Sequence, residues 1–441
     1  MSDAPTPTDP NPTDPAPDTQ SDAPNLAAER WDWPRKELPV GISHFKSIRQ
    51  EKAFYADKTQ YLFQLVQEPG WNFLARPRFF GKSLLVYSLE CLLKGQKELF
   101  NGLWIADTDY SWTPYPVIRL EMSLYDSMDV KGMDERFTNR LSCIAEKENV
   151  KLKATNAGET LTRLIELLYQ KTGQKVAVLI DAYDKLILRR LRTPKEAQEV
   201  LDFLRDFYGT LKTSEDLLSH VFITGIMRLA FATIFPKLDK LKDITFAEEY
   251  ANVGGFTEAE LDNLFSRVGD KALRHFRYHH ERFKDYIGFK DVKIEGVEYL
   301  RGLLKKFYYG HTFVNQTLGD PNIDDQSRLY NPFAVFRFLE EGQVESYWIE
   351  WGSPSHFMDL NGRRDENVFQ VITKPQTLNA AQNYITDVKA IDPVTLLFQT
   401  GYLAIKEVKP NPNGPPDYLL FMPNQEIRDW LIPLADPKAK K

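Results

Sequence analysis

The chain has 441 residues, of which 42% are hydrophobic and 27% charged, and its formal net charge is −6. No apolar run reaches the roughly 18–20 residues needed to cross a membrane, which excludes a membrane-spanning protein, and the acidic balance gives no general attraction to nucleic acids. One hydrophobic core serves at most about 250–300 residues, so we expect two or three domains.

The two cysteines, Cys91 and Cys143, lie among apolar or helix-forming neighbours. A disulfide framework is therefore not expected, and a reducing, cytoplasmic location fits. Residues 1–36 are rich in Pro, Asp, Thr and Ser and begin without the basic and apolar regions of a secretory signal. Such a segment cannot bury enough apolar surface to order itself, so we expect a disordered acidic tail.

Strands and helices alternate over residues 37–250. The run "WNFLARP" predicts a strand, "KSLLVYSLECLLKG" a helix and "YPVIRLEMS" a second strand, followed by helical segments to about residue 172. "KVAVLIDAYD" and "HVFITGI" are continuous apolar runs typical of buried parallel strands, with the helical "AQEVLDFLRDFYGTL" between them. This order predicts an α/β fold in which helices cover both faces of a parallel sheet.

The predicted secondary structure changes after residue 250, where alternating strands and helices give way to mostly helices. "FTEAELDNLFSRVG" opens with the Thr-x-x-Glu pattern of a helix start, and helices are expected through 251–318, as a helical lid. Residues 319–432 are rich in aromatics and turns and end in a predicted hairpin and helix, which favours a winged-helix-like module. Residues 433–441 are expected to form a basic tail.

The junction of the first strand and its helix carries a candidate phosphate-binding loop. Backbone N–H groups at the start of a helix bind phosphate oxygens, Lys82 would reach the β and γ phosphates, and Ser83 would bind Mg²⁺. A Gly-Lys-Ser triplet alone is often accidental, and Arg76 stands where such loops usually begin with glycine. The candidate ATP-binding residues are Arg76, Pro77, Arg78, Phe79, Phe80, Gly81, Lys82, Ser83 and Leu84.

Two polar residues at other strand ends support the nucleotide interpretation. Asp181 ends "VAVLID", where a carboxylate would hold Mg²⁺ together with Ser83, and Thr224 ends "VFITG", where a hydroxyl would contact the γ-phosphate or the attacking water. The carboxyl ends of parallel strands meet at one edge of a sheet. The sequence therefore predicts a P-loop NTPase of the additional-strand type, with ATP and Mg²⁺ as ligands.

Many short motifs also resemble, in order, the bacterial and archaeal AAA-ATPase-like family, which is usually fused to a PD-D/E-x-K nuclease-like C-terminal domain. They run from about residue 39 to 430 and include "GISHFKSIRQEKAFYADKT", "LARPRFFGKSLL", "VLIDAYDKL", "VFITGIMRL", "GGFTEAEL", "KFYYGHTF", "YNPFAVFRFL", "YWIEWGSPS" and "LFQTGYLAI". The family loop reads R-P-R-R-F-G-K-S, so the resemblance implies an arginine at Arg76, whereas Phe79 departs from it. Asp57 and Lys58 match a further landmark, which implies either a place near the nucleotide or a helix cap.

The sharpest departure from the family is Ala182. The family usually has a glutamate there, which would act as the general base that activates the attacking water. The resemblance thus implies that ATP binding is kept and hydrolysis is impaired, through either a natural loss or an engineered substitution. Arg228, soon after the fourth strand, is a candidate γ-phosphate sensor or an ordinary ion-paired arginine.

Three functions stay open at this stage: an ATPase, a nucleotide-switched binding module without turnover, and an ATP-gated nuclease. Asp392 precedes Glu407 and Lys409 in a spacing that resembles a nuclease site. The family's nuclease motif lies further downstream, so we expect that domain to be absent or truncated here. A homo-oligomer, and a nucleic-acid or protein partner for the C-terminal module, remain open.

Overall fold

The computed structural model describes residues 37–67, 69–125, 129–287, 296–314, 327–352 and 374–435. The predicted acidic tail at 1–36 and residues 436–441 of the predicted basic tail lie outside the described residues. Within these ranges, no helix has the length and apolar character needed to span a membrane.

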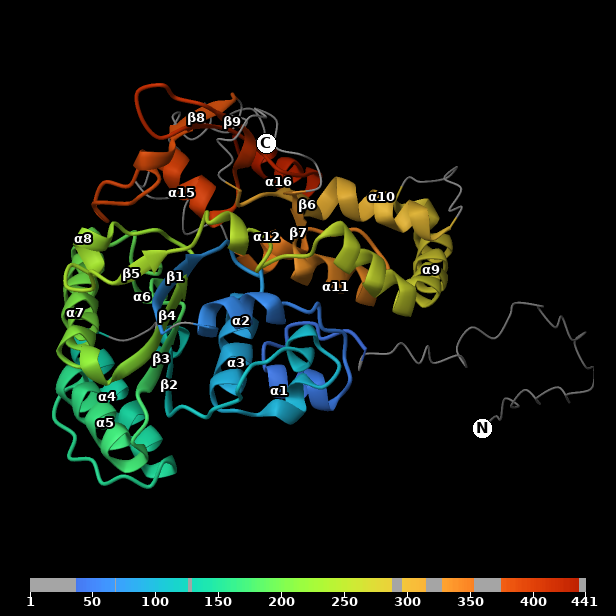
Figure 1. The fold of residues 1–441 in the computed structure, drawn as a ribbon. Coiled ribbons are helices and arrows are strands. Elements are labelled where there is room, and N and C mark those ends of the chain that lie inside the picture. The colour runs from blue at the N-terminus through green and yellow to red at the C-terminus, as the bar shows by residue number, and fades with distance from the viewer. Residues whose placement is uncertain are drawn as a thin grey trace, which may run out of the picture. The chain divides into compact units, whose positions relative to one another are not determined.

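A five-stranded parallel sheet forms the centre of the fold (Figure 1). Its order is β2-β3-β4-β1-β5, so β4 lies between β1, which enters the phosphate loop, and β3, which ends in Asp181. This arrangement confirms the predicted α/β fold with an added strand. The strands are β1 (Trp71–Ala75), β2 (Val117–Glu121), β3 (Val176–Asp181), β4 (Leu218–Gly225) and β5 (Leu241–Asp243).

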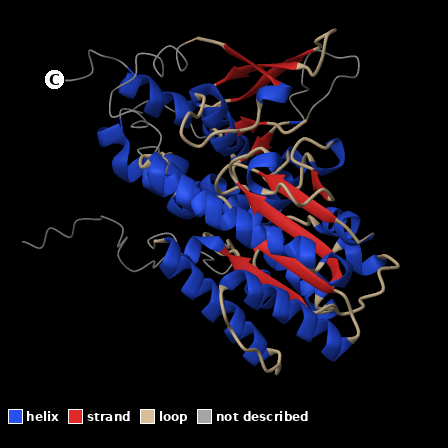
Figure 2. Cartoon of the chain, turned by 90° about the vertical axis from the view of Figure 1, so that its left-hand side faces the viewer, coloured by secondary structure: helices blue, strands red, loops and turns tan. Residues whose placement is uncertain are grey.

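Helices cover both faces of the sheet because its strands alternate apolar side chains between two cores (Figures 1 and 2). Leu74, Leu179 and Phe222 face α3, whereas Phe73, Ile180 and Ile223 face the opposite layer. The first layer contains α1 (Phe45–Gln50), α2 (Thr59–Gln67) and α3 (Lys82–Leu93); the second contains α4 (Val130–Lys147), α5 (Ala157–Thr172) and α7 (Pro194–Thr213). Short helices are α6 (Lys185–Leu188) and α8 (Phe231–Ile234).

The segment after β5 is mostly helical, as predicted. Thr257 and Glu260 bond reciprocally, with Thr257 N donating to the Glu260 carboxylate (2.9 Å) and Glu260 N donating to the Thr257 hydroxyl (3.2 Å), so the predicted capping box is confirmed. The elements are α9 (Glu258–Ile287), α10 (Val297–Tyr308), β6 (Tyr309–His311), β7 (Leu329–Tyr330), α11 (Pro332–Glu341) and α12 (Tyr347–Gly352). That they act as a lid stays a prediction.

The C-terminal part contains the predicted hairpin and helix. Strands β8 (Gln376–Asn379), β10 (Asp417–Phe421) and β9 (Ala404–Lys409) form an antiparallel sheet in that order. Helix α15 (Pro393–Thr400) precedes β9, and α16 (Gln425–Ala435) extends three residues past the predicted boundary at 432. The winged-helix assignment stays a prediction.

Candidate nucleotide-binding site

The loop between β1 and α3 has the backbone form of an anion site. The Arg76 N–H donates to the Gly225 carbonyl (3.1 Å), which ties the loop to the end of β4. Gly81 has a φ of 80°, and no side chain caps the start of α3. Phe79 has a φ of 65°, which a non-glycine residue adopts only where its surroundings enforce it. The first N–H groups of α3 therefore lack a side-chain partner, as phosphate binding requires.

Lys82 lies between the loop and two carboxylates. Its Nζ donates to the Pro77 carbonyl at 2.8 Å, so the lysine folds back over the loop. Burial lowers the pKa of Lys82 to about 8, although the negative charges of Asp181 and Asp184 oppose that shift. A bound phosphate would supply a stronger partner for this ammonium than the carbonyl does.

Asp181, Ser83 and Thr224 converge at the carboxyl edge of the sheet, as the sequence predicted. Burial raises the pKa of Asp181, and a hydrogen bond from the Ser83 side chain and the charge of Lys82 counteract the rise. The Asp181 Oδ1 and Thr224 Oγ1 atoms are buried and lack a hydrogen-bond partner within the described ranges. A hydroxyl and a carboxylate are hard oxygen donors that suit Mg²⁺, so these residues fit that ion.

Ala182 follows directly and has a φ of 57°, the left-handed region that alanine rarely adopts. Its methyl group cannot accept a proton. Asp184, two residues on, is held by its Oδ2, which accepts from the N–H groups of Ile226 (2.9 Å) and Met227 (2.5 Å). Asp184 is fully buried and joins the end of β3 to the turn after β4.

Arg76 is buried, and its guanidinium is held by backbone carbonyls and an aromatic ring. Its Nη1 donates to the carbonyls of Ala75 (2.9 Å) and Thr245 (2.6 Å), its Nη2 to that of Tyr250 (2.9 Å), and its guanidinium lies 4.1 Å from the Phe313 ring. The arginine that replaces the usual glycine thus fastens the start of the loop to the segment after β5.

Residues from the C-terminal half cover the rest of the loop, a feature that the sequence did not reveal. The contact is tight, since a Cβ added to Gly401 would lie 2.8 Å from the Pro77 Cβ. His311 Nε2 donates to the Gly401 carbonyl (2.8 Å), and burial lowers the pKa of His311 to about 4. Four residues of the loop contact residues of the C-terminal half. Pro77 packs against Gly401, the Phe79 ring centroid lies 4.4 Å from the Phe333 centroid and the Phe80 centroid 4.9 Å from the His311 centroid, and Arg78 interacts electrostatically with Tyr402.

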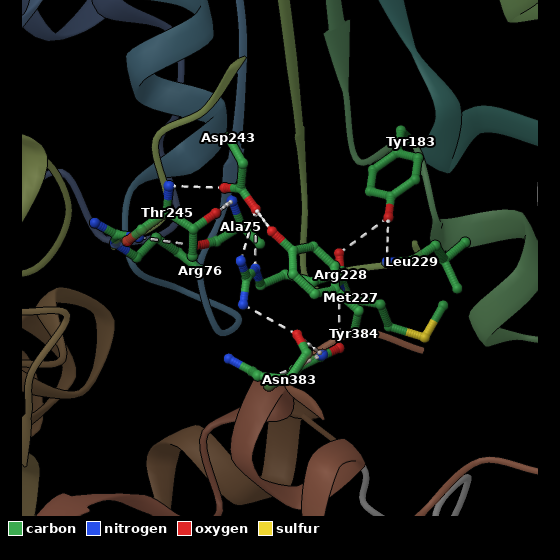
Figure 3. Close-up of polar contacts among 11 residues, drawn as sticks. Ala75, Arg76, Tyr183, Met227, Arg228, Leu229, Asp243, Thr245, Asn383 and Tyr384 are labelled. Carbon is green, nitrogen blue, oxygen red and sulfur yellow. Dashed lines mark hydrogen bonds and ion pairs between the residues drawn. The ribbon is translucent and has the colours of Figure 1, made fainter. Parts of the chain in front are cut away.

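Arg228 is held in an ion pair, one of the two alternatives that the sequence left open (Figure 3). Its Nε and Nη2 donate to Asp243 Oδ2 at 3.1 and 2.8 Å, and its Nη1 donates to the Asn383 carbonyl at 3.0 Å. The guanidinium also lies 4.0 Å from the Tyr384 ring. Arg228 therefore connects the end of β5 to the C-terminal part, and in this structure its donors are used there.

The Asp57 landmark is a helix cap. Asp57 Oδ1 accepts from the N–H (2.9 Å) and hydroxyl (2.6 Å) of Thr59 at the start of α2. Lys58 pairs with Glu260 (2.6 Å) and donates to the Asn252 carbonyl (2.7 Å). Lys58 thereby links the segment before α2 to the start of α9, at the wall of the pocket described next.

An apolar pocket opens beside the start of α3, with an empty volume of about 550 Å³ that includes open solvent. Segments from before α2, the phosphate loop, the stretch after β5 and α11 all contribute to it. A flat aromatic base attached to a triphosphate on this loop would need an apolar surface at this place. The lining residues are Pro39, Ile42, Phe54, Tyr55, Ala56, Lys58, Phe80, Gly81, Leu84, Leu85, Val253, Gly254, Gly255, Phe256, Pro332 and Phe336.

The residues of the nuclease alternative do not form a recognisable metal site. Asp392 caps α15, since its Oδ2 accepts from the N–H (2.8 Å) and hydroxyl (2.7 Å) of Thr395. Glu407 and Lys409 lie on β9. Across the part of the chain that the structure describes, no group of three or more His, Cys, Asp or Glu side chains is placed to hold a metal ion.

Comparisons with known proteins find proteins that are similar to parts of this chain. An uncharacterized protein in the vnfD 5′ region of Azotobacter chroococcum mcd 1 is 27% identical over 399 residues, which cover 89% of this chain and 69% of that protein. Among solved structures, Drosophila ORC bound to GC-rich DNA and Cdc6 matches with a TM-score of 0.31 and 10% identity, over 55% of this chain and 35% of that chain. Drosophila ORC bound to poly(dA/dT) DNA and Cdc6 (conformation 1) matches with a TM-score of 0.33 and 11% identity, over 62% and 42%. This chain thus spans less than half of either Drosophila chain.

A family model matches just under half of the chain, including the phosphate loop and the strands around it. Residues 39–235 fit the family described as predicted AAA-ATPase, and this range contains β1 to β4 with Lys82, Asp181 and Thr224. The nuclease-like domain to which the family is usually fused is not part of this match. Over this range the chain is similar to that family.

Proposed function

We propose that the protein binds ATP with Mg²⁺ at the carboxyl edge of the central sheet and hydrolyses it slowly. The observation that carries this proposal is the meeting of Lys82, Ser83 and Asp181 at the uncapped start of α3. Buried oxygens of Asp181 and Thr224 without described partners support it, because unpaired buried polar atoms are costly unless a ligand or water satisfies them.

Each residue has a distinct task in this proposal. The N–H groups at the start of α3 bind phosphate oxygens, Lys82 neutralises the β and γ phosphates, and Thr224 orients the γ-phosphate. Ser83 and Asp181 would hold Mg²⁺, which supplies charge neutralisation on the phosphate oxygens when it is bound. The adenine base would occupy the apolar pocket beside Leu84.

Calorimetric titration with ATP tests the binding proposal. Lys82→Ala should weaken ATP binding by about 10–100-fold, the value of one charge-assisted hydrogen bond. Lys94→Ala is the matched control, because Lys94 lies at the other end of α3 in an ion pair with Glu90 and should keep the affinity within about twofold. Equal affinities for the Lys82→Ala variant and the unmodified protein would refute the site.

Hydrolysis is expected to be slow because Ala182 cannot supply the glutamate that the family usually has at this position, so any base must come from another residue. General-base catalysis contributes about 10²–10⁴-fold, so Ala182→Glu should raise the rate of phosphate release. If Ala182→Glu gives no gain in rate, the assignment of position 182 to the base is wrong.

A nucleotide switch without turnover is the second candidate, and the cover over the phosphate loop favours it. Because Pro77 and Phe79 pack directly against Gly401 and Phe333, a loop that shifts on ATP binding would move the C-terminal half. Tight ATP binding with no turnover, even in the Ala182→Glu variant, would support the switch. That the C-terminal part binds a nucleic acid, a protein or a second copy of the chain stays a prediction.

A reducing, cytoplasmic location is part of this proposal. Both cysteines are free, with Cys91 buried and Cys143 exposed, and an exposed thiol is kept reduced most readily in that compartment.

A further inference from the structure

Glu121 is a carboxylate at the edge of the sheet that the proposed site does not use. It is the last residue of β2 and is paired in register with Asp181, the last residue of β3. Side chains of paired residues on parallel neighbouring strands lie on the same face of the sheet. Glu121 therefore faces the same side as Asp181, one strand further from the phosphate loop.

Contacts to α3 show how far along this face Glu121 lies. Arg119, two residues earlier on β2, contacts Glu90 (2.6 Å) and lies 4.0 Å from the Tyr87 ring, both on α3. From Arg119 to Glu121 the strand advances by about 7 Å toward the carboxyl edge. From Tyr87 back to Ser83 the helix advances by about 6 Å toward that same edge. Measured from Glu90 the same step along the helix is about 10 Å, so Glu121 lies within about 4 Å of the level of Ser83 along this face.

The Glu121 carboxylate is lightly held and reachable by water. Its Oε1 accepts from the Ser123 hydroxyl (2.8 Å), and its Oε2 lies 3.6 Å from Arg119 Nη1, beyond hydrogen-bond distance. The side chain is 31% exposed. Burial is the largest cause of the raised pKa of Asp181. The negative charge of Glu121 raises that pKa further, in keeping with the proximity of the two carboxylates.

We propose that Glu121 is the carboxylate that orients the water attacking the γ-phosphate, in place of the side chain that Ala182 lacks. The water oxygen forms a bond to the γ phosphorus, and the bond from that phosphorus to the β–γ bridging oxygen breaks with its electron pair leaving on ADP. Glu121 accepts the water proton and passes it to solvent. The products are ADP and inorganic phosphate.

The alternative for Glu121 is a purely structural partner of Arg119. Glu90 provides the matched control, because it contacts the same arginine more closely (2.6 Å against 3.6 Å) but sits seven residues beyond Ser83 on α3. A structural role predicts that Glu90→Gln perturbs the protein at least as much as Glu121→Gln. A catalytic role predicts that only Glu121→Gln affects turnover.

The experiment compares Glu121→Gln with the unmodified protein, and it rests on the proposed ATP site. Phosphate release should fall by about 100-fold or more, while ATP affinity stays within about twofold. A second measurement, independent of turnover, is the retention of ADP with aluminium fluoride, which mimics the attacked phosphate. Glu121→Gln should lose the gain in retention that aluminium fluoride gives and keep the affinity for ADP alone.

Adding Ala182→Glu to the Glu121→Gln variant should restore turnover, because a carboxylate then returns to the water. The inference is overturned if Glu121→Gln releases phosphate and retains ADP with aluminium fluoride like the unmodified protein. It is also overturned if the unmodified protein binds ATP yet releases no more phosphate than Lys82→Ala. If the unmodified protein fails to bind ATP in the titration, the proposed function fails first and the inference falls with it.

Discussion

The ion pair of Arg228 and Asp243 is predicted to hold the C-terminal part against the strand edge, and Arg228→Met is the perturbation that tests it. The arginine makes two hydrogen bonds to Asp243 and one to the Asn383 carbonyl. The side chains are 9% and 12% exposed, so solvent screens the pair weakly. Although burial alone would raise the pKa of Asp243, the charge of Arg228 holds it below its usual value.

The loss of stability in Arg228→Met depends on the hydrogen bonds that Asp243 keeps without the arginine. Without Arg228, the buried carboxylate loses its charged partner and retains neutral donors, which include the Thr245 N–H (2.9 Å), the Thr245 side chain and the Tyr384 hydroxyl (3.0 Å). Removing one member of a buried pair costs about 3–5 kcal/mol. At about 2–4 °C per kcal/mol for a domain of 150–250 residues, the melting temperature should fall by roughly 6–20 °C.

The assay combines thermal unfolding with titrations of ATP and ADP. Arg228→Lys keeps the charge but loses the two-pronged contact, so it should fall between Arg228→Met and the unmodified protein. ATP and ADP affinities should change together, because the arginine acts on the fold rather than on one phosphate. An unchanged melting temperature with a loss of affinity for ATP but not ADP would show that Arg228 senses the γ-phosphate, and would refute the reasoning.

Three further predictions follow from the loop and its neighbours. Gly401→Ala should lower the free energy of unfolding by about 1–3 kcal/mol and weaken ATP binding, because its Cβ presses on Pro77 and its φ of 92° strains alanine. Gly173→Ala shares the backbone strain (φ 68°) but meets open space, so it should cost less and leave ATP binding unchanged; equal effects would contradict the contact. ATP affinity should fall by up to about tenfold per pH unit as the pH rises past about 8, because free Lys82 loses its proton there and a bound phosphate favours the charged form. Calorimetry in buffers of different ionisation enthalpy should show proton uptake on ATP binding. Lys82→Ala should abolish that uptake. Ala182→Gly should stabilise the fold by about 1 kcal/mol in thermal unfolding, since glycine adopts a φ of 57° without strain; a loss of stability would contradict that explanation.

The sheet and the polar residues at its edge were predictable from sequence. Buried parallel strands are continuous apolar runs, so β3 and β4 stood out, and the polar residue that ends each run marked the edge. Asp181 and Thr224 could be placed at this edge because their position depends only on where each strand ends. The capping box at Thr257 was equally local.

The cover over the phosphate loop could not be predicted, because its contacts join residues more than 200 positions apart. Gly401 contacts Pro77 and Phe333 stacks on Phe79 without any periodic pattern that would reveal it. The direction of the Arg76 side chain depends likewise on carbonyls at Thr245 and beyond.

Glu121 escaped attention for a related reason. The sequence places it at the end of a strand, but its proximity to Asp181 depends on the register between β2 and β3. That register is a property of the folded sheet, which no single strand specifies. The choice between the two alternatives for Arg228 likewise required its tertiary partner, Asp243.

A structure determined with ATP and Mg²⁺ tests the central claim most directly. The account predicts the triphosphate at the start of α3, with phosphate oxygens bound by Lys82 and by backbone N–H groups of the loop. It also predicts the metal ion beside Ser83 and Asp181, and the adenine base in the apolar pocket next to Leu84. A nucleotide bound elsewhere, or none at saturating ATP, would contradict the account.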